Sequence, residues 1–221
     1  MKVSYRLVII VAVFITCLIT ANVVAVKMIS FGPVTVFAGI FVFPVSYIFG
    51  DVLTEVYGYR LARRVIWLGF ACNLVFVFFA WLGQILPAAS VWENQKAYEV
   101  ILGATPRLLA ASFCGYLVGE FANSFVLSRM KILTRGRWLW SRTIGSTVIG
   151  EGLDTVVFTV VFTIGTPYFV PMVMLYQWLG KVIIEAAATP ATYAIVGWLK
   201  RREGVDTYDY GTRYNPFVMS D

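Results

Sequence analysis

The stretch TIGSTVIGEGLDTVVFTVVFTIG, from Thr143 to Gly165, is long and apolar enough to cross a membrane, yet two carboxylates lie near its centre. A bilayer core of roughly 30 Å is spanned by about 20 apolar residues in a helix. Asp154 lies at the midpoint of the stretch, and Glu151 lies one turn before it on the same helix face. The segment therefore predicts a transmembrane helix whose polar face is directed into the protein.

Five further segments have the same length and apolar character. They are Tyr5–Val26, Val34–Val56, Val65–Leu86, Arg107–Leu127 and Met172–Trp198. Hydrophobic residues make up 59% of the 221 residues and charged residues only 14%, whereas a soluble domain has about 25% charged residues. This composition excludes an ordinary soluble enzyme, a disordered chain and a disulfide-rich secreted domain. We expect an all-α membrane protein with six transmembrane helices in one domain (residues 1–202), followed by a polar, mobile cytoplasmic tail (residues 203–221).

Lysine and arginine are distributed unevenly about the six segments. Fourteen of the 18 basic residues lie at the N-terminus (Lys2 and Arg6), in the second and fourth connections, or after the sixth segment. The positive-inside rule therefore places both termini in the cytoplasm. The net charge of +6 is then a signal of topology, and we expect no binding of nucleic acid.

Two irregular features are expected besides the six helices. The third connection, residues 87–106, is the longest outer loop and predicts a short helix lying on the membrane surface. Thr189-Pro190 is expected to break the sixth helix, as in transporters whose helices are interrupted around a polar site.

Ionisable residues lie within the predicted helices, where each costs about 2.5–3.5 kcal/mol on insertion scales and usually marks function. The residues assigned to substrate binding are Glu120, Asn123, Glu151, Asp154, Gln177 and Lys181. With Glu185, four carboxylates from three helices stand against one lysine. The excess predicts a polar site for a flat, hydrogen-bonding solute, and the alternative is that these charges only hold the helices together. The aromatic walls expected for this site are Phe121, Phe158, Tyr176 and Trp178.

A second polar group is expected at the cytoplasmic end of the second segment. Asp51 and Glu55 are four residues apart, and three arginines follow them in the connection. They predict either an interfacial ionic network or a cytoplasmic gate whose salt bridges form and break. For Lys27, at the outer end of the first segment, the alternative is a side chain that only reaches the membrane interface. The residues assigned to gating or coupling are Asn22, Lys27, Asp51, Glu55, Arg63 and Arg64.

Several kinds of chemistry are absent from the sequence. The chain has no histidine, and Cys17, Cys72 and Cys114 each lie in an apolar run without a CxxC pair. We therefore expect neither a metal site, nor a disulfide, nor a cofactor. The chain also has no phosphate-binding loop, so active transport needs an ion gradient, a partner ATPase or trapping of the solute inside the cell.

Three long stretches resemble the queuosine precursor transporter family, which is also described as a vitamin-uptake-type family. They are FPVSYIFGDVLTEVYGYRLARRVIW (Phe43–Trp67), LGATPRLLAASFCGYLVGEFANSFVLSRMK (Leu102–Lys131) and RTIGSTVIGEGLDT (Arg142–Thr155). The resemblance implies a six-helix protein of a bacterial or archaeal inner membrane, similar in fold to the substrate-binding subunits of energy-coupling-factor transporters. The motif positions that match are Asp51, Glu55, Glu120, Asn123, Asp154 and Lys181. Glu151 departs from the family pattern, which favours an amide there.

The resemblance implies uptake of 7-cyano-7-deazaguanine or 7-aminomethyl-7-deazaguanine, the precursors from which queuosine is made in tRNA. We expect a stand-alone secondary carrier that requires no partner ATPase, and the sequence leaves open whether it forms a homodimer. The alternative is a substrate-binding subunit that docks on an ATP-driven module through Ala21 and Ala25 of the first helix. A membrane-embedded enzyme with a metal held by Asp51 and Glu55 is a third interpretation, and the three arginines beside this pair argue against it.

Overall fold

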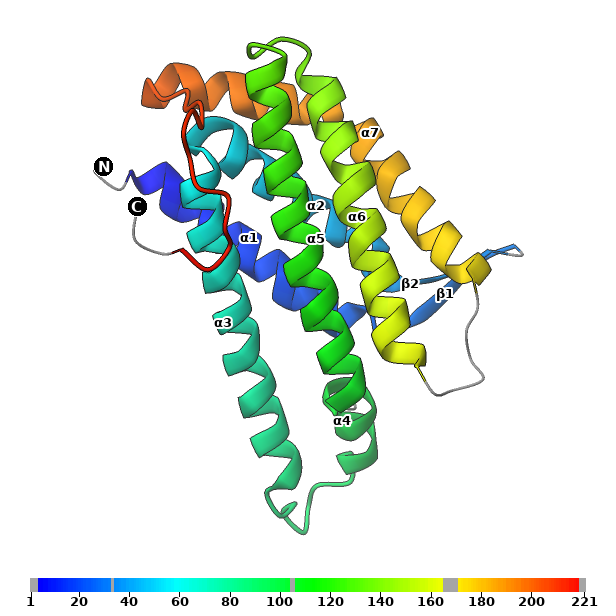
Figure 1. Ribbon diagram of the computed structural model, residues 1–221. Helices are drawn as coiled ribbons and strands as arrows, with labels where there is room; N and C mark the ends of the chain where they lie inside the picture. Colours follow the sequence, from blue (N-terminus) through cyan, green and yellow to red (C-terminus); the bar gives the residue numbers. More distant parts are fainter. Residues whose placement is uncertain (1–3, 33, 104–105, 165–170, 219–221) are drawn as a thin grey trace.

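The computed structural model describes residues 4–32, 34–103, 106–164 and 171–218. Gly165, the predicted end of the fifth segment, and residues 219–221 of the tail lie outside these ranges. Long helices form one bundle, with a small hairpin at its side (Figure 1). The elements are α1 (Tyr5–Val24), β1 (Met28–Phe31), β2 (Val34–Phe37), the 3-10 turn η1 (Ala38–Phe41), α2 (Phe43–Val52), the π-helical turn η2 (Leu53–Tyr57), α3 (Tyr59–Ile85), α4 (Gln95–Leu102), α5 (Pro106–Leu133), α6 (Leu139–Thr163) and α7 (Pro171–Glu203).

Six helical spans within the described ranges are long and apolar enough to cross a membrane, which confirms the predicted number. They are Tyr5–Val24, Ala38–Tyr57, Tyr59–Ile85, Leu109–Leu133, Leu139–Thr163 and Met174–Glu203. Large apolar side chains remain on the outside of the bundle, among them Phe79 of α3 and Ile183 of α7, each more than half exposed. Such a surface suits lipid and not water. The chain is therefore a multi-pass membrane protein.

The second span begins later than the sequence predicts. Residues 34–37 form strand β2 instead of helix, and pair in antiparallel register with β1, Met28 opposite Phe37. Gly32 has a φ of 59°, a left-handed conformation that glycine adopts without strain, and it lies in the turn between the strands. The N–H of Ala38 donates to the carbonyl of Lys27 at 2.8 Å and closes the base of the hairpin.

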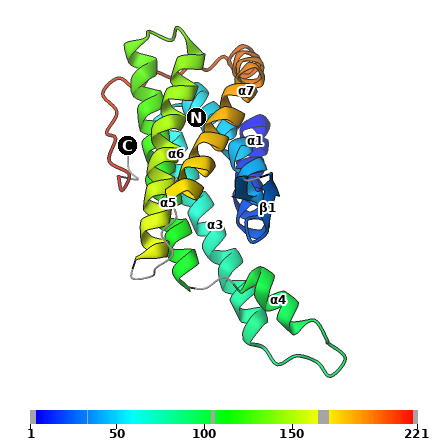
Figure 2. The same cartoon turned by 90° about the vertical axis from the view of Figure 1, so that its right-hand side faces the viewer.

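The short helix predicted in the third connection is confirmed as α4, whereas its place on the outer membrane surface stays a prediction. Together with the end of α3 it projects beyond the other helices, as Figure 2 shows. None of its residues is buried, so α4 is held mainly by its contact with α3.

Helices α5 and α6 make the most extensive contact in the bundle. Two glycines allow this approach, because a Cβ placed on Gly119 would lie 3.0 Å from the carbonyl oxygen of Gly150 and 2.7 Å from the Cβ of Asp154. A Cβ on Gly150 would in turn lie 2.7 Å from the Cβ of Asn123. Small residues thus bring two polar helix faces together, a common device in membrane bundles.

Helix α7 is continuous across Pro190, so the predicted break at Thr189-Pro190 is wrong. The helix instead changes direction in its second half, where Figure 1 shows its orange part crossing the top of the bundle. Proline lacks an N–H and its ring crowds the preceding turn, which bends a helix without necessarily ending it.

The described tail residues are held against the protein, although the sequence predicts a mobile tail. Asp209 Oδ2 accepts the N–H of Tyr59, the first residue of α3, at 2.9 Å and the hydroxyl of Ser128 at 2.7 Å. Arg63 Nη1 donates to the carbonyls of Arg213 and Asn215, each at 3.0 Å. We call this end of the bundle, where α3 begins, α5 and α7 end and the tail lies, the basic end.

The N-terminal helix lies at the same end as the tail. Arg6 Nη1 is 3.1 Å from Glu203 Oε1 at the end of α7. Ala21 of α1 is completely buried, and a Cβ on Gly39 would meet the Ala21 carbonyl and the Ala25 Cβ, each at 3.1 Å. Ala21 is therefore covered by the chain itself, whereas Ala25 is half-buried. The alternative in which these residues dock a partner module stays a prediction.

Candidate functional site

The centre of the bundle contains a lysine bound by two carboxylates. Lys181 of α7 lies 2.5 Å from Glu151 Oε2 and 2.8 Å from Asp154 Oδ2, both on α6. The i, i+3 spacing predicted for the two acids is what places both carboxylates on the face that meets α7. The Lys181 amino group also lies 4.9 Å from the centre of the Phe43 ring at the start of α2. Three helices therefore meet at one cation.

Glu120 of α5 lies beside this lysine without binding it. It is fully buried, and neither carboxylate oxygen has a hydrogen-bond partner among the described residues. Its electrostatic neighbours are Glu151, Asp154, Lys181 and Glu185. Gly50 of α2 makes room for the carboxylate, since a Cβ there would lie 3.2 Å from Glu120 Oε2. A buried carboxylate with both acceptor oxygens free is chemically suited to a ligand that presents two donors.

The aromatic residues next to the charged groups differ from those expected. Phe43 lies over Lys181, and Tyr47 of α2 is buried among Glu120, Glu151 and Asp154. Phe121, by contrast, is packed in a separate cluster with Tyr59 and Ile66, its ring 5.8 Å from that of Trp67.

Of the other three expected aromatic residues, two have described contacts. Trp178 donates to the carbonyl of Val148 at 3.1 Å, and Phe158 is stacked on Phe162. The sequence analysis did not predict Phe43 or Tyr47 as site residues. Their contact with the charged groups depends on the packing of α2 against α7, which cannot be inferred from the spacing of residues within one segment.

Asp51 and Glu55 have different partners, although they are only four residues apart in the chain. The π-helical turn η2 begins between them, and such a turn interrupts the regular α-helical spacing that aligns side chains four residues apart. Asp51 Oδ1 accepts the Asn123 amide at 2.7 Å, and Asp51 Oδ2 has no partner in the described part of the chain. Asn123 is thus joined to Asp51 and not to the Lys181 group, while Thr54 and Ser124 share a hydrogen bond of 3.1 Å one turn further on.

Glu55 is the centre of an ionic cluster at the basic end. Its Oε1 atom lies 2.8 Å from Arg142 Nη2, 2.7 Å from Lys200 Nζ and 3.7 Å from Lys131 Nζ. These cations end or begin three different helices. The sequence had indicated Arg63 and Arg64 as the partners because they are adjacent in the chain, whereas the observed partners are 76 to 145 residues away.

The tail joins this cluster through Asp206. Its Oδ1 atom lies 2.6 Å from Lys131 Nζ and 2.8 Å from Lys200 Nζ. Partial burial by itself raises the pKa of Asp206, but the hydrogen bonds from the two lysines outweigh this and hold the pKa below its usual value. Asp206 is therefore ionised at neutral pH and ties the tail to α5 and α7.

The other predicted gating residues are dispersed. Asn22 donates to Asn73 at 2.8 Å and accepts the Ser112 hydroxyl at 3.0 Å, which joins α1 to α3 and α5. Lys27 is exposed at the base of the hairpin and takes no part in the hydrogen bonds that join Asn22 to Asn73 and Ser112. Arg63 is buried under the tail, whereas Arg64 is exposed on α3.

Two polar residues of α7 complete the interior. Gln177, one turn before Lys181, is mostly buried, and its amide nitrogen has no partner in the described ranges. Glu185, one turn after Lys181, is 1% exposed, and both of its carboxylate oxygens likewise lack a partner there. No group of three or more Asp, Glu, Cys or His suited to a metal ion is found among the residues described.

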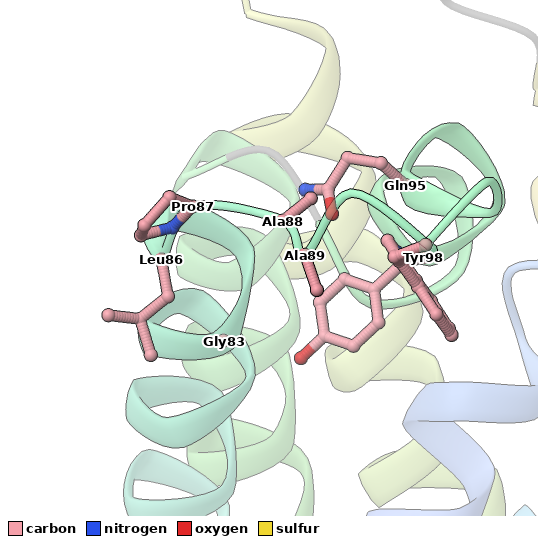
Figure 3. Close-up of a pocket in the computed structure, with 8 residues that line it drawn as sticks. Gly83, Leu86, Pro87, Ala88, Ala89, Gln95 and Tyr98 are labelled. Atoms are coloured by element: carbon pink, nitrogen blue, oxygen red, sulfur yellow. The ribbon is translucent and has the colours of Figure 1, made fainter.

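A cavity of about 360 Å³ lies far from these charges, between the end of α3 and α4 (Figure 3). Leu86, Pro87, Ala89 and Tyr98 are among its lining residues, and no carboxylate or amino group lines it. Another cavity, of about 290 Å³, lies at the basic end between Arg60 and the tail. Neither cavity is lined by any residue of the Lys181 group.

Comparison with known proteins agrees with a transport site. The sequence profile of the family described as "Putative vitamin uptake transporter" matches residues 37–195, which include the Lys181 group and Glu55 with Lys131 and Arg142, but not Lys200. The chain belongs to this family. The family is one of transporters and not of enzymes, as the sequence predicts, so the membrane-enzyme interpretation is rejected.

Two curated proteins are similar to this chain over half of its length or more. A Bacillus subtilis (strain 168) protein named "Probable queuosine precursor transporter" is 30% identical over 179 residues, 80% of this chain and 78% of that protein. The Escherichia coli (strain K12) "Queuosine precursor transporter" is 28% identical over 120 residues, 54% of this chain and 52% of that protein. No solved structure matches the chain, so the expected similarity in fold to energy-coupling-factor subunits stays a prediction.

Proposed function

We propose that this chain imports 7-cyano-7-deazaguanine or 7-aminomethyl-7-deazaguanine, for queuosine synthesis, as a stand-alone secondary carrier. The observation that carries the proposal is a buried Glu120 with both oxygens free beside Lys181, in a chain similar to two proteins named for queuosine precursors. The substrate-binding residues we assign are Glu120, Asn123, Glu151, Asp154, Gln177 and Lys181.

The chemistry of a deazaguanine matches these groups. Its N1–H and 2-amino group are adjacent donors, and one carboxylate can accept both, which assigns the guanine edge to Glu120. Its O6 atom needs a donor, which the free Gln177 amide or Lys181 supplies. The aromatic rings of Phe43 and Tyr47 offer flat apolar contact to the purine-like ring.

An aminomethyl substituent adds a positive charge to the solute. Glu151 and Asp154 both contact Lys181. One of these two carboxylates would release Lys181 and bind the ammonium group of the solute instead. The cyano form has no such charge and would leave the Lys181 contacts intact. The site is thus compatible with both precursors. We expect binding of the aminomethyl form to depend more strongly on the Asp154 carboxylate than binding of the cyano form.

The Glu55 cluster is the gate in this proposal, with the basic end facing the cytoplasm by the positive-inside rule. Arg142 of α6 and Lys200 of α7 are bound to one carboxylate from η2, so the helices around the site are tied together at this end. Release of the solute to the cytoplasm would require these contacts to separate. Asp51, Arg63 and Arg64 surround the same end, and Asn22 and Lys27 belong to the opposite gate.

The test uses a bacterium unable to make queuosine precursors and lacking its own importer. The chain is expressed there without any added ATPase module, nanomolar 7-cyano- or 7-aminomethyl-7-deazaguanine is supplied, and queuosine in tRNA is measured. We expect queuosine to be restored by the unaltered chain and not by the empty vector.

Two outcomes would contradict the proposal in different ways. Restoration only when an energy-coupling module is added would replace the stand-alone carrier by the binding-subunit alternative. No restoration with either addition, in cells whose membranes contain the protein, would reject deazaguanines as the solute.

A further inference from the structure

Three carboxyl groups in the interior are left without a cation once Lys181 is bound to Glu151 and Asp154. They are Asp51, Glu120 and Glu185, each no more than 1% exposed. Both oxygens of Glu120 and of Glu185, and one oxygen of Asp51, lack a hydrogen-bond partner within the described ranges. An ionised carboxylate cannot be held in this way without a large cost, so each of these groups is either protonated or bound to a species that enters the protein.

Within this set, Asp51 and Glu185 lie on two helices that are in contact. The helices that carry them, α2 and α7, are packed against each other (Figure 1), both carboxyl groups are buried in this interior, and Glu185 is among the electrostatic neighbours of Asp51. The remaining titratable groups that act on the pair are Glu120 of α5, Glu151 of α6 and Glu55 of η2. All of these are acids. Lys181, one turn before Glu185 on α7, is bound to Glu151 and Asp154 instead, and no ion pair to Asp51 or Glu185 is found among the described residues.

The pair also lies between the two functional groups of the proposed carrier. Along α7, Glu185 is one turn beyond Lys181 in the direction of Lys200, and along the second span Asp51 is one turn before Glu55. Asn123 holds one oxygen of Asp51 and leaves the other free on the buried side. A charge taken up by the pair therefore sits between the solute site and the basic end.

We propose that Asp51 and Glu185 form the binding site of a coupling proton, which enters with the solute and leaves at the basic end. The inference rests on the proposed carrier function and names its driving ion. When both groups are ionised, the like charges repel across the contact of α2 with α7. A single proton lets the two carboxyl groups share a hydrogen bond and the helices close. One proton is bound and later released in each cycle, and no other bond changes.

The test uses the full-length protein reconstituted in liposomes, with 7-cyano-7-deazaguanine as the solute. A pH difference of about one unit, alkaline inside, can drive about tenfold accumulation if one proton moves with each solute. We expect the unaltered protein to approach that ratio, to acidify a pH dye inside the liposomes, and to lose both effects with a protonophore.

The informative variant is Glu185→Gln, which resembles the protonated acid at nearly the same size. We expect it to exchange external for internal solute without a gradient, yet to accumulate the solute only to equal concentrations under the same pH difference. Asp51→Asn is the second variant, and we expect it too to exchange solute without accumulating it. Glu93→Gln, at an exposed carboxylate of the outer loop, is the matched control and is expected to accumulate solute like the unaltered protein.

The possible failures are distinguishable. Exchange by the unaltered protein without a response to pH, or accumulation that follows a sodium gradient, would overturn the proton site and leave the carrier function standing. Accumulation by Glu185→Gln equal to that of the unaltered protein would also overturn it. Loss of exchange in both variants would assign the pair to solute binding instead, and absence of exchange by the unaltered protein would reject the carrier function itself.

Discussion

At the scale of single residues, Lys181 has the largest predicted effect. Its amino group binds both Glu151 and Asp154, and breaking a buried ion pair on one side costs about 3–5 kcal/mol. We expect Lys181→Ala to lower the initial rate of 7-cyano-7-deazaguanine uptake by at least about 100-fold, the equivalent of roughly 3 kcal/mol. Asp154→Asn is expected to abolish uptake as well.

The matched control is Lys96→Ala, which removes an exposed lysine of α4 and should leave the uptake rate unchanged. Immunoblots of the membrane fraction correct each rate for the amount of protein. If Lys181→Ala and Asp154→Asn both transported at the unaltered rate, this cluster would not be the solute site.

Glu120 is expected to control the recognition of the guanine edge. A carboxylate accepts two adjacent donors, whereas a glutamine amide accepts one and directs its own N–H₂ at the other. Because a hydrogen bond to a charged group is worth about 1.5–3 kcal/mol, Glu120→Gln should raise the KM about 10- to 100-fold. The variant should also lose the preference over an analogue in which hydrogen replaces the 2-amino group.

Competition of labelled solute by this analogue measures the preference directly. Glu99→Gln, at an exposed carboxylate of α4, serves as control and should keep the preference. An unaltered protein that failed to distinguish the analogue from the 2-amino compound would refute the assignment of Glu120.

At the scale of elements, the contact between α5 and α6 depends on Gly119. A Cβ at this position would lie 2.7 Å from the Cβ of Asp154, so Gly119→Ala must separate the two helices, at a cost of about 1–3 kcal/mol. Gly197→Ala is the control, since nothing within 4 Å would meet its Cβ and alanine in a helix is favoured over glycine by about 0.5–1 kcal/mol. Thermal unfolding in detergent should give a lower Tm for Gly119→Ala and an equal or higher Tm for Gly197→Ala. Equal Tm values for the two variants would show that the helices do not approach so closely.

The tail should stay attached over the whole neutral range and detach only in acid. The folded pKa of Asp206 is lowered, after the raising effect of burial, by Lys131 and Lys200. Its contribution to stability is therefore fully present above the unfolded pKa, about 3.9, and is lost as the pH falls through the lower folded value. A spin label on Tyr210→Cys, in a variant without other cysteines, should remain immobile from pH 8 to pH 5 and become mobile below about pH 4.

The variant Asp206→Asn tests the same contact at neutral pH. It should make the label mobile at pH 7, whereas Glu99→Gln should not. A label that becomes mobile between pH 7 and pH 5 in the unaltered tail would show that another group controls this attachment.

At the scale of the whole molecule, the two ends of the bundle differ in charge and in the ionic contacts that tie the helices together. The basic end carries the Glu55 cluster and the tail, while α4 and the hairpin lie toward the other end (Figures 1 and 2). We expect the basic end in the cytoplasm. A fluorescent protein fused to the C-terminus should therefore be fluorescent, and alkaline phosphatase inserted between Ala88 and Ala89 should be active. The opposite pattern at both positions would invert the orientation and the direction of the proposed gates.

The sequence by itself determined the membrane class, the six spans and the residues that share one helix face. These features follow from local quantities, because the apolar length of a segment and the spacing of its acids do not depend on the rest of the fold. Glu151 and Asp154 meet Lys181 as the helical spacing predicts. The family could likewise be recognised from contiguous motifs, since residues 37–195 match it without any knowledge of the structure.

Only the tertiary structure decided which charges are paired and which are left free. Glu55 binds Arg142 and Lys200 from two other helices in place of its sequence neighbours, because α6 and α7 bring these cations to η2. Pro190, at which the sequence predicts a break, lies inside the continuous helix α7. Partners separated by many residues are selected by how whole helices pack, and that packing is a property of the entire bundle which no single segment encodes.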